Sequence, residues 1–128
     1  MILDSSAIIA ILCREPGWEL LLEKIEKASV VGVGAPNVAE ANIVATSKRG
    51  NEGPARVARL LLEAKAMVVP FGDDHITLFN DAFRRYGKGR HPAALNMGDC
   101  FAYAIAKGAG MPLLCVGDHF PKTDLTIA

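Results

Sequence analysis

The chain has 128 residues, a length typical of one domain that buries a single hydrophobic core without disulfides or a structural metal. Apolar residues make up 51% of it and charged residues 22%, a globular composition and not that of a disordered chain. Fourteen Lys and Arg balance fourteen Asp and Glu, which argues against a protein that coats nucleic acid through a general basic field. A zero sum still permits an acidic pocket beside a basic rim.

The sequence shows no membrane or export signal. The longest unbroken apolar run, Ala7 to Cys13, is far too short to span a bilayer. Asp4 interrupts the apolar start and no basic region precedes it, so we expect no signal peptide. Cys13, Cys100 and Cys115 lack metal-site or redox spacing and stand among apolar neighbours, as core cysteines in a reducing compartment do. We therefore expect a cytoplasmic protein.

Short apolar segments alternate with amphipathic ones along the chain. This alternation predicts an α/β fold whose parallel sheet is covered by helices on both faces. In such folds ligands bind beyond the carboxyl ends of the strands. In chain order, the predicted elements are a strand at 1–3, a helix capped by Ser5-Ser6 to about residue 14, a helix at 18–28, a strand at 30–33, a helix at 36–48, a helix at 54–64, a strand at 67–69, a helix at 73–86, a basic loop at 87–94, a helix at 96–107, a strand at 113–116 and a short fifth strand at 125–127.

Four acidic residues fall at that edge of the predicted sheet. Asp4 directly follows the first strand, and Asp118 follows the fourth strand past Gly117. Glu40 and Asp99 lie in the first two turns of their helices, which begin at the same edge. Packed carboxylates repel one another unless they bind a cation or take up protons, and Mg²⁺ or Mn²⁺ prefers such oxygen ligands. The pattern indicates metal-assisted phosphodiester hydrolysis.

Each acid also has a purely structural interpretation. Asp4 can cap the first helix, and Asp99 stands three residues after Asn96 in a near capping-box arrangement. Asp118 can be an ordinary turn residue, and Glu40 can be exposed or ion-paired. The conjunction of all four favours the metal site.

The motifs around these acids resemble the PIN-domain family, in particular the VapC-type ribonuclease toxins of type II toxin–antitoxin systems. The motifs occur in the family's order and cover essentially the whole chain. The segment Ala35-Pro36-Asn37, which precedes Glu40, departs from the family pattern. The segments that carry it are Met-Ile-Leu-Asp-Ser-Ser-Ala at 1–7, Val-Ala-Glu-Ala at 38–41, Leu-Asn-Met-Gly-Asp-Cys at 95–100 and Leu-Leu-Cys-Val-Gly-Asp-His-Phe-Pro-Lys-Thr-Asp at 113–124.

The resemblance implies a single PIN-like domain over 1–128, built as a three-layer α/β/α sandwich around a central parallel sheet. It implies that the four acids are catalytic and hold Mg²⁺ or Mn²⁺, with Glu40 binding the metal or orienting the water. Ser6 and Asn96 match supporting positions. The implied activity is an endoribonuclease toxin that cuts tRNA or rRNA to leave 5′-phosphate and 3′-hydroxyl ends. The implied partners are a VapB-like antitoxin, which neutralises the toxin, and a second copy of the chain in a homodimer.

A basic cluster precedes the helix that bears Asp99, and it either contacts RNA phosphates or forms a solvated loop. We take four of its members as substrate-binding candidates: Arg84, Arg85, Lys88 and Arg90.

Other function classes fit less well. A receiver-like phosphoacceptor domain needs an acidic pair after the first strand, where this chain has Leu3-Asp4-Ser5. A haloacid-type phosphatase needs Asp-x-Asp there. A metal-free ribonuclease that uses a pair of histidines is not indicated, because the sequence does not place two histidines together. A nucleotide cofactor is not indicated either, because the sequence lacks the glycine-rich loop that would bind it. A catalytically silent PIN-like binding module remains an alternative. His119 and Phe120 follow Asp118 where an acidic or polar residue is common in the family.

Overall fold

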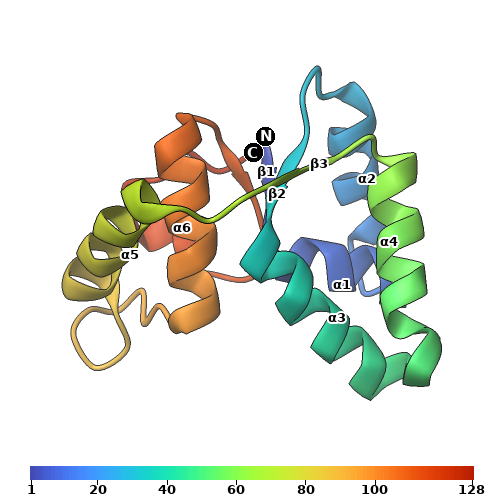
Figure 1. Cartoon of the computed structure of the whole chain (residues 1–128), viewed down its shortest axis with the longest axis horizontal. Coiled ribbons are helices and arrows are strands. Elements are labelled where there is room, and N and C mark those ends of the chain that lie inside the picture. The colour runs from blue at the N-terminus through green and yellow to red at the C-terminus, as the bar shows by residue number, and fades with distance from the viewer.

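The computed structural model describes all 128 residues as a small parallel sheet surrounded by helices (Figure 1). None of the helices combines the length and the apolarity that crossing a membrane requires. The elements are β1 (Ile2–Leu3), α1 (Ser5–Cys13), α2 (Trp18–Lys27), β2 (Gly32–Gly34), α3 (Ala35–Arg49), a 3₁₀ turn (Gly50–Glu52), α4 (Gly53–Glu63), β3 (Met67–Val69), α5 (Asp73–Tyr86), α6 (Met97–Ala109), β4 (Leu113–Leu114) and a second 3₁₀ turn (Phe120–Lys122).

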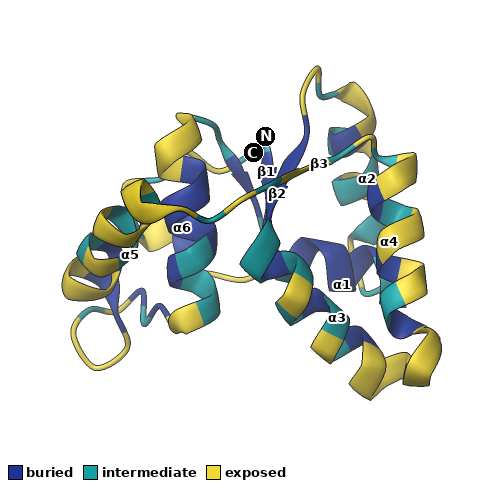
Figure 2. Cartoon of the chain, in the orientation of Figure 1, coloured by how far each residue is buried: buried dark blue, intermediate teal, exposed yellow.

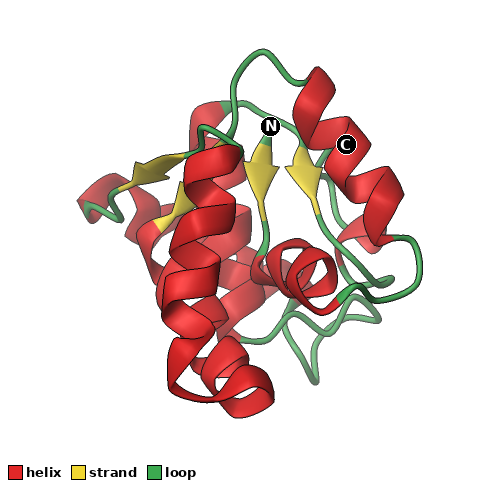
Figure 3. Ribbon diagram, turned by 90° about the vertical axis from the view of Figure 1, so that its right-hand side faces the viewer, coloured by secondary structure: helices red, strands yellow, loops and turns green.

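The four strands form one parallel sheet in the order β3-β2-β1-β4. In Figure 3 the arrow of the strand that begins at the N-terminus and that of its neighbour point the same way. The predicted fifth strand at 125–127 is reduced to a single bridge between Leu113 and Ile127. The reason is that Asp124, just before it, is bound to α6, where it accepts hydrogen bonds from Tyr103 and Lys107. Only the last residues of the chain therefore reach the sheet edge.

Side chains of the short strands alternate between the two faces of the sheet. Leu3, Val33 and Leu114 pack into a core with α1 to α4, whereas Ile2 and Leu113 pack into a second core with α5 and α6. Figure 1 shows these two helix groups on opposite sides of the sheet, and Figure 2 shows buried residues on both of its faces. The predicted three-layer sandwich is confirmed.

The helix starts settle which of the residues offered by the sequence cap the helices. Asp4, and not Ser5 or Ser6, is the N-cap of α1, and its side chain accepts a hydrogen bond from the Ser6 amide. Asn96 caps α6 in a reciprocal capping box with Asp99, as expected. Both caps place acidic side chains at the carboxyl edge of the sheet.

Candidate active site

Asp4 is buried at the end of β1. Asp4 is only 3% exposed, and its Oδ2 accepts hydrogen bonds from the backbone amide (3.0 Å) and the hydroxyl (2.5 Å) of Ser6. Its Oδ1 is buried without any partner. Burial raises the pKa of Asp4 to about 6, against the lowering effect of the Ser6 hydrogen bonds, and the charges of Asp99 and Glu40 act in the same direction as burial. The carboxylate therefore has an unsatisfied oxygen in an environment of like charge.

Glu40, in the second turn of α3, lies beside the starts of α1 and α6. The Ser5 hydroxyl donates a hydrogen bond to its Oε1. On the other side its carboxylate fits against the bare backbone of Gly98, where a Cβ would lie 1.8 Å from Glu40 Oε2. Asn37 reinforces this junction, because its buried amide donates to the Gly98 carbonyl at 3.1 Å. Glycine at position 98 is what lets the glutamate reach the start of α6.

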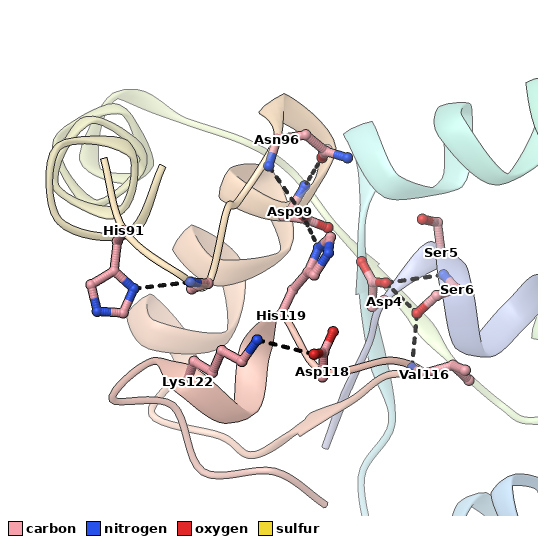
Figure 4. A network of polar contacts seen from close by, with 12 residues as sticks. Asp4, Ser5, Ser6, His91, Asn96, Asp99, Val116, Asp118, His119 and Lys122 are labelled. Carbon is pink, nitrogen blue, oxygen red and sulfur yellow. Dashed lines mark hydrogen bonds and ion pairs between the residues drawn. The ribbon is translucent and has the colours of Figure 1, made fainter. Parts of the chain in front are cut away.

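Asp99 faces the same region from the first turn of α6. Its Oδ2 accepts a hydrogen bond from the Asn96 amide at 3.0 Å and lies 3.2 Å from His119 Nδ1 (Figure 4). Only 14% of its side chain is exposed. The positive end of the helix dipole stabilises a carboxylate at this position. Asp99 thus combines the capping role and the proximity to Asp4 that the sequence left as alternatives.

Asp118 lies farther out than the other three acids. Its side chain is 78% exposed and forms an ion pair with Lys122 at 3.0 Å (Figure 4). Hydrogen bonding from Lys122 holds the pKa of Asp118 below its usual value. The segment before it is attached to the site by Ser6, whose hydroxyl accepts a hydrogen bond from the Val116 amide at 3.0 Å. The structure therefore brings Asp4, Glu40 and Asp99 together and leaves Asp118 at the surface.

The donor chemistry of the three inner acids fits a divalent cation. Carboxylate oxygens suit Mg²⁺ and Mn²⁺, and the unpartnered Asp4 Oδ1 is a buried acceptor that a cation would satisfy. No three His, Cys, Asp or Glu side chains already lie in a geometry that holds a metal. Binding would thus require side chains of the inner acids to rotate.

The basic candidates divide into two pairs. Arg84 and Arg85 both form ion pairs with Asp81, and Arg85 also lies 3.5 Å from Asp124. Lys88 and Arg90 are exposed in the loop after α5, where Arg90 stacks over the Phe83 ring. Lys88 and Arg90 are the pair with free positive charge.

Four residues contribute to the site although the sequence did not indicate them as site residues: Ser5, Asn37, Gly98 and His119. Ser5 is adjacent to a predicted support residue, and Gly98 is adjacent to Asp99 within the quoted motif. Asn37 and His119 act across segments distant in sequence, and only tertiary contact reveals them.

A separate apolar groove lies on the other side of the molecule from α5 and α6. It has a volume of about 1180 Å³ and is formed by α1, α2, α4, the segment just before β2 and the start of β3. Trp18, Leu22 and Leu60 contribute apolar surface, and Arg56 and Arg59, which form ion pairs with Glu52 and Glu63, also line the groove. None of the acidic site residues lines the groove.

Comparison with known proteins gives consistent matches over the whole chain. The PIN domain family profile matches residues 1–125. Ribonuclease VapC36 of Mycobacterium tuberculosis is 43% identical over 126 residues, covering 98% of this chain and 91% of the relative.

Two solved structures have the same fold. The sarcin-ricin loop cleaving toxin VapC20 of Mycobacterium tuberculosis superposes with a TM-score of 0.81 at 13% identity, covering 99% of this chain and 97% of that one. A toxin–antitoxin complex from Klebsiella pneumoniae gives a TM-score of 0.73 at 13% identity, covering 99% and 95%. With the acidic residues at the end of the sheet and the sequence identity to VapC ribonucleases, these matches show that the chain belongs to the PIN-domain family and resembles its VapC members.

Proposed function

We propose that this protein is a metal-dependent endoribonuclease toxin of the VapC type, formed by a single domain over 1–128. The observation that carries the proposal is the buried Asp4 carboxylate, whose Oδ1 has no partner and which feels the charges of Asp99 and Glu40. A protein keeps such an arrangement at the cost of stability when the charged groups serve chemistry. The 43% identity to a named ribonuclease supports RNA as the substrate.

The inner acids have distinct roles in this proposal. Asp4 and Asp99 would hold a divalent ion, Mg²⁺ or Mn²⁺, and Glu40 would bind the ion or orient the attacking water. When bound, the ion lowers the pKa of water and neutralises charge on the phosphodiester. Ser6 fixes the orientation of the Asp4 carboxylate, and the backbone amide of Asn96 fixes that of the Asp99 carboxylate. Asp118, predicted as a fourth ligand, would have to leave Lys122 to take part.

Phosphate contacts are assigned to the exposed basic loop. Lys88 and Arg90 have no carboxylate partner within ion-pair distance, so their charges are available to a structured RNA such as tRNA or rRNA. Arg84 and Arg85 keep a secondary role, because Asp81 already offsets part of their charge.

The proposal includes a VapB-like antitoxin as partner, a homodimer, and a cytoplasmic location. A neighbour of the same fold was solved as a toxin–antitoxin complex. The apolar groove between α2 and α4 suits an antitoxin segment with apolar anchors, because Trp18, Leu22 and Leu60 line it. Edge strand β3 exposes Met67 and Val68, and α3 exposes Ile43 at 70%, which supports pairing with a second copy.

Replacing one inner acid tests the activity directly. We expect Asp99→Asn to lower metal-dependent cleavage of total cellular RNA roughly 100-fold or more, because a ligand charge is lost while the α6 cap is kept. The measurement is sequencing of new 5′ ends with Mg²⁺, Mn²⁺ or chelator. Asp73→Asn, at an exposed position in the first turn of α5, is the matched control and should cut normally. Full activity in Asp99→Asn, or 2′,3′-cyclic phosphate ends, would contradict the proposal; a folded protein that binds metal but cuts no RNA would indicate a silent binding module.

The pKa of Asp4 predicts a pH-dependent stability. The pKa of Asp4 is about 6 in the folded protein and 3.8 in the unfolded chain, so the folded state holds this proton more tightly. The protonated Asp4 carboxyl therefore costs the folded state nothing below pH 4, and the free energy of unfolding falls as the pH rises from about 4 to about 6. We expect metal-free Asp4→Asn to have a free energy of unfolding about 3 kcal/mol above wild type at pH 7, with the difference shrinking as the pH falls to 4. Urea unfolding with chelator from pH 4 to 7 measures this.

The exposed Asp118 serves as the control for that series. Its pKa is shifted in the opposite direction, so Asp118→Asn should give no gain in stability at pH 7. A difference between Asp4→Asn and wild type that did not vary with pH would rule out the burial of Asp4 as its cause.

The contact between Gly98 and Glu40 predicts a selective loss of activity. In Gly98→Ala the new methyl group would occupy the position of Glu40 Oε2, so Glu40 must move and cleavage should fall roughly 10- to 100-fold. Gly108→Ala is the matched control on the same helix, since its Cβ meets only the side chains of His75 and Leu78 at 3.3 Å. Both rates come from a fluorogenic RNA assay, and equal activity of the two variants would refute a positioned Glu40.

The groove predicts where antitoxin binding can be lost without loss of catalysis. Leu22→Glu introduces a charge into the apolar groove, so we expect it to abolish co-purification with the cognate antitoxin while RNA cleavage persists. Leu20→Glu, on the same helix but 57% exposed and outside the groove, should co-purify normally. Retention of the antitoxin by Leu22→Glu would place the interface elsewhere.

A further inference from the structure

His119 occupies the place beside the inner acids that the sequence pattern assigned to Asp118. Its Nδ1 lies 3.2 Å from Asp99 Oδ2, while the neighbouring Asp118 points its carboxylate to Lys122 at 3.0 Å. The imidazole is about half exposed, and Figure 4 shows it reaching toward the start of α6. The next residue, Phe120, is buried in the core of α5 and α6, so the backbone that carries His119 is anchored.

The turn before His119 explains why two consecutive residues have such different environments. Gly117 adopts a φ of +97°, in the left-handed region that favours glycine, and the chain then enters the 3₁₀ turn at Phe120. The Lys122 side chain of that turn holds Asp118 at the surface. His119 is therefore the residue of this segment whose side chain contacts an inner acid, Asp99.

The contact with Asp99 has the spacing of two donor atoms that share one ion. Adjacent ligands of an octahedral ion with bonds of about 2.1 Å are separated by about 3 Å, close to the 3.2 Å between His119 Nδ1 and Asp99 Oδ2. A second feature, on the neighbouring inner acid, also points to a ligand. Asp4 Oδ1 is buried without a partner, and Asp4 feels the charge of Asp99.

We propose that His119 is a nitrogen ligand of the active-site metal, adjacent to Asp99, and that it biases the site toward Mn²⁺ over Mg²⁺. Magnesium binds imidazole poorly, whereas first-row transition ions accept nitrogen ligands. The inference rests on the proposed function, because it concerns the metal of that same site. It replaces Asp118 by His119 in the ligand set, so the site has Asp4, Asp99 and His119 as metal ligands and Glu40 as ligand or water-orienting group.

A spectroscopic experiment without RNA tests the inference. The full-length protein is loaded with Mn²⁺, and pulsed electron paramagnetic resonance detects coupling between the ion and a ¹⁴N nucleus. We expect nitrogen coupling in wild type and its loss in His119→Asp, which still binds Mn²⁺ through an oxygen. His91→Gln is the control, because His91 lies in the loop after α5, accepts a hydrogen bond from the Ala93 amide and points away from the acids in Figure 4; it should keep the coupling.

Calorimetry of both ions gives the second readout. We expect the ratio of the Mg²⁺ to the Mn²⁺ dissociation constant to fall about tenfold from wild type to His119→Asp, since an oxygen replaces a nitrogen ligand. Asp99→Asn establishes that the ion occupies this site. Nitrogen coupling that is absent from wild type, or unchanged in His119→Asp, while Mn²⁺ binding depends on Asp99, would overturn the inference and leave the proposed nuclease intact. Absence of Asp99-dependent binding would overturn both the inference and the metal dependence.

Discussion

The burial of one carboxylate, that of Asp4, is the constraint on which the arrangement of the site depends. Asp4 ends β1 and caps α1, so its position is set by the centre of the sheet and by the first helix together. Removing this group from water disfavours its charged form, and only the Ser6 hydrogen bonds offset that cost. The other polar residues of the site are arranged around this unsatisfied charge.

Three polar contacts hold the surrounding segments in place. Ser6 joins Asp4 to the chain after β4 through the Val116 amide, and Ser5 joins α1 to Glu40 on α3. Asn37 joins α3 to the carbonyl of Gly98 at the start of α6. The Asn37 contact links α3, from the core of α1 to α4, with α6, from the other core, so the active site lies where the two halves of the sandwich meet.

The two faces of the molecule have separate tasks in this interpretation. The edge of the sheet, with its inner acids and the exposed Lys88 and Arg90, provides the chemistry and the phosphate contacts. The apolar groove between α2 and α4 is remote from those acids and offers a docking surface for a protein segment. Because the two surfaces are separate, substitutions in the groove can change antitoxin binding and leave catalysis unchanged.

The sequence by itself determined the α/β class, the parallel sheet and most element positions, because apolar periodicity and turn residues are local signals. It also placed four acids near one edge of the sheet, since strand ends and helix starts share that edge. The sequence did not predict that residues 125–127 would pair with β4 by a single bridge. The hydrogen bonds that Tyr103 and Lys107 donate to Asp124 are tertiary contacts, which local patterns do not reveal.

Only the tertiary structure distinguished among the acids and revealed their neighbours. Asp118 and His119 are adjacent in sequence, yet Lys122 holds the first at the surface while the second contacts Asp99. The requirement for glycine at position 98 arises from Glu40, 58 residues away in the chain. Side-chain direction after a turn, and the close approach of two helices, depend on packing between distant segments, which a local pattern of residues does not encode.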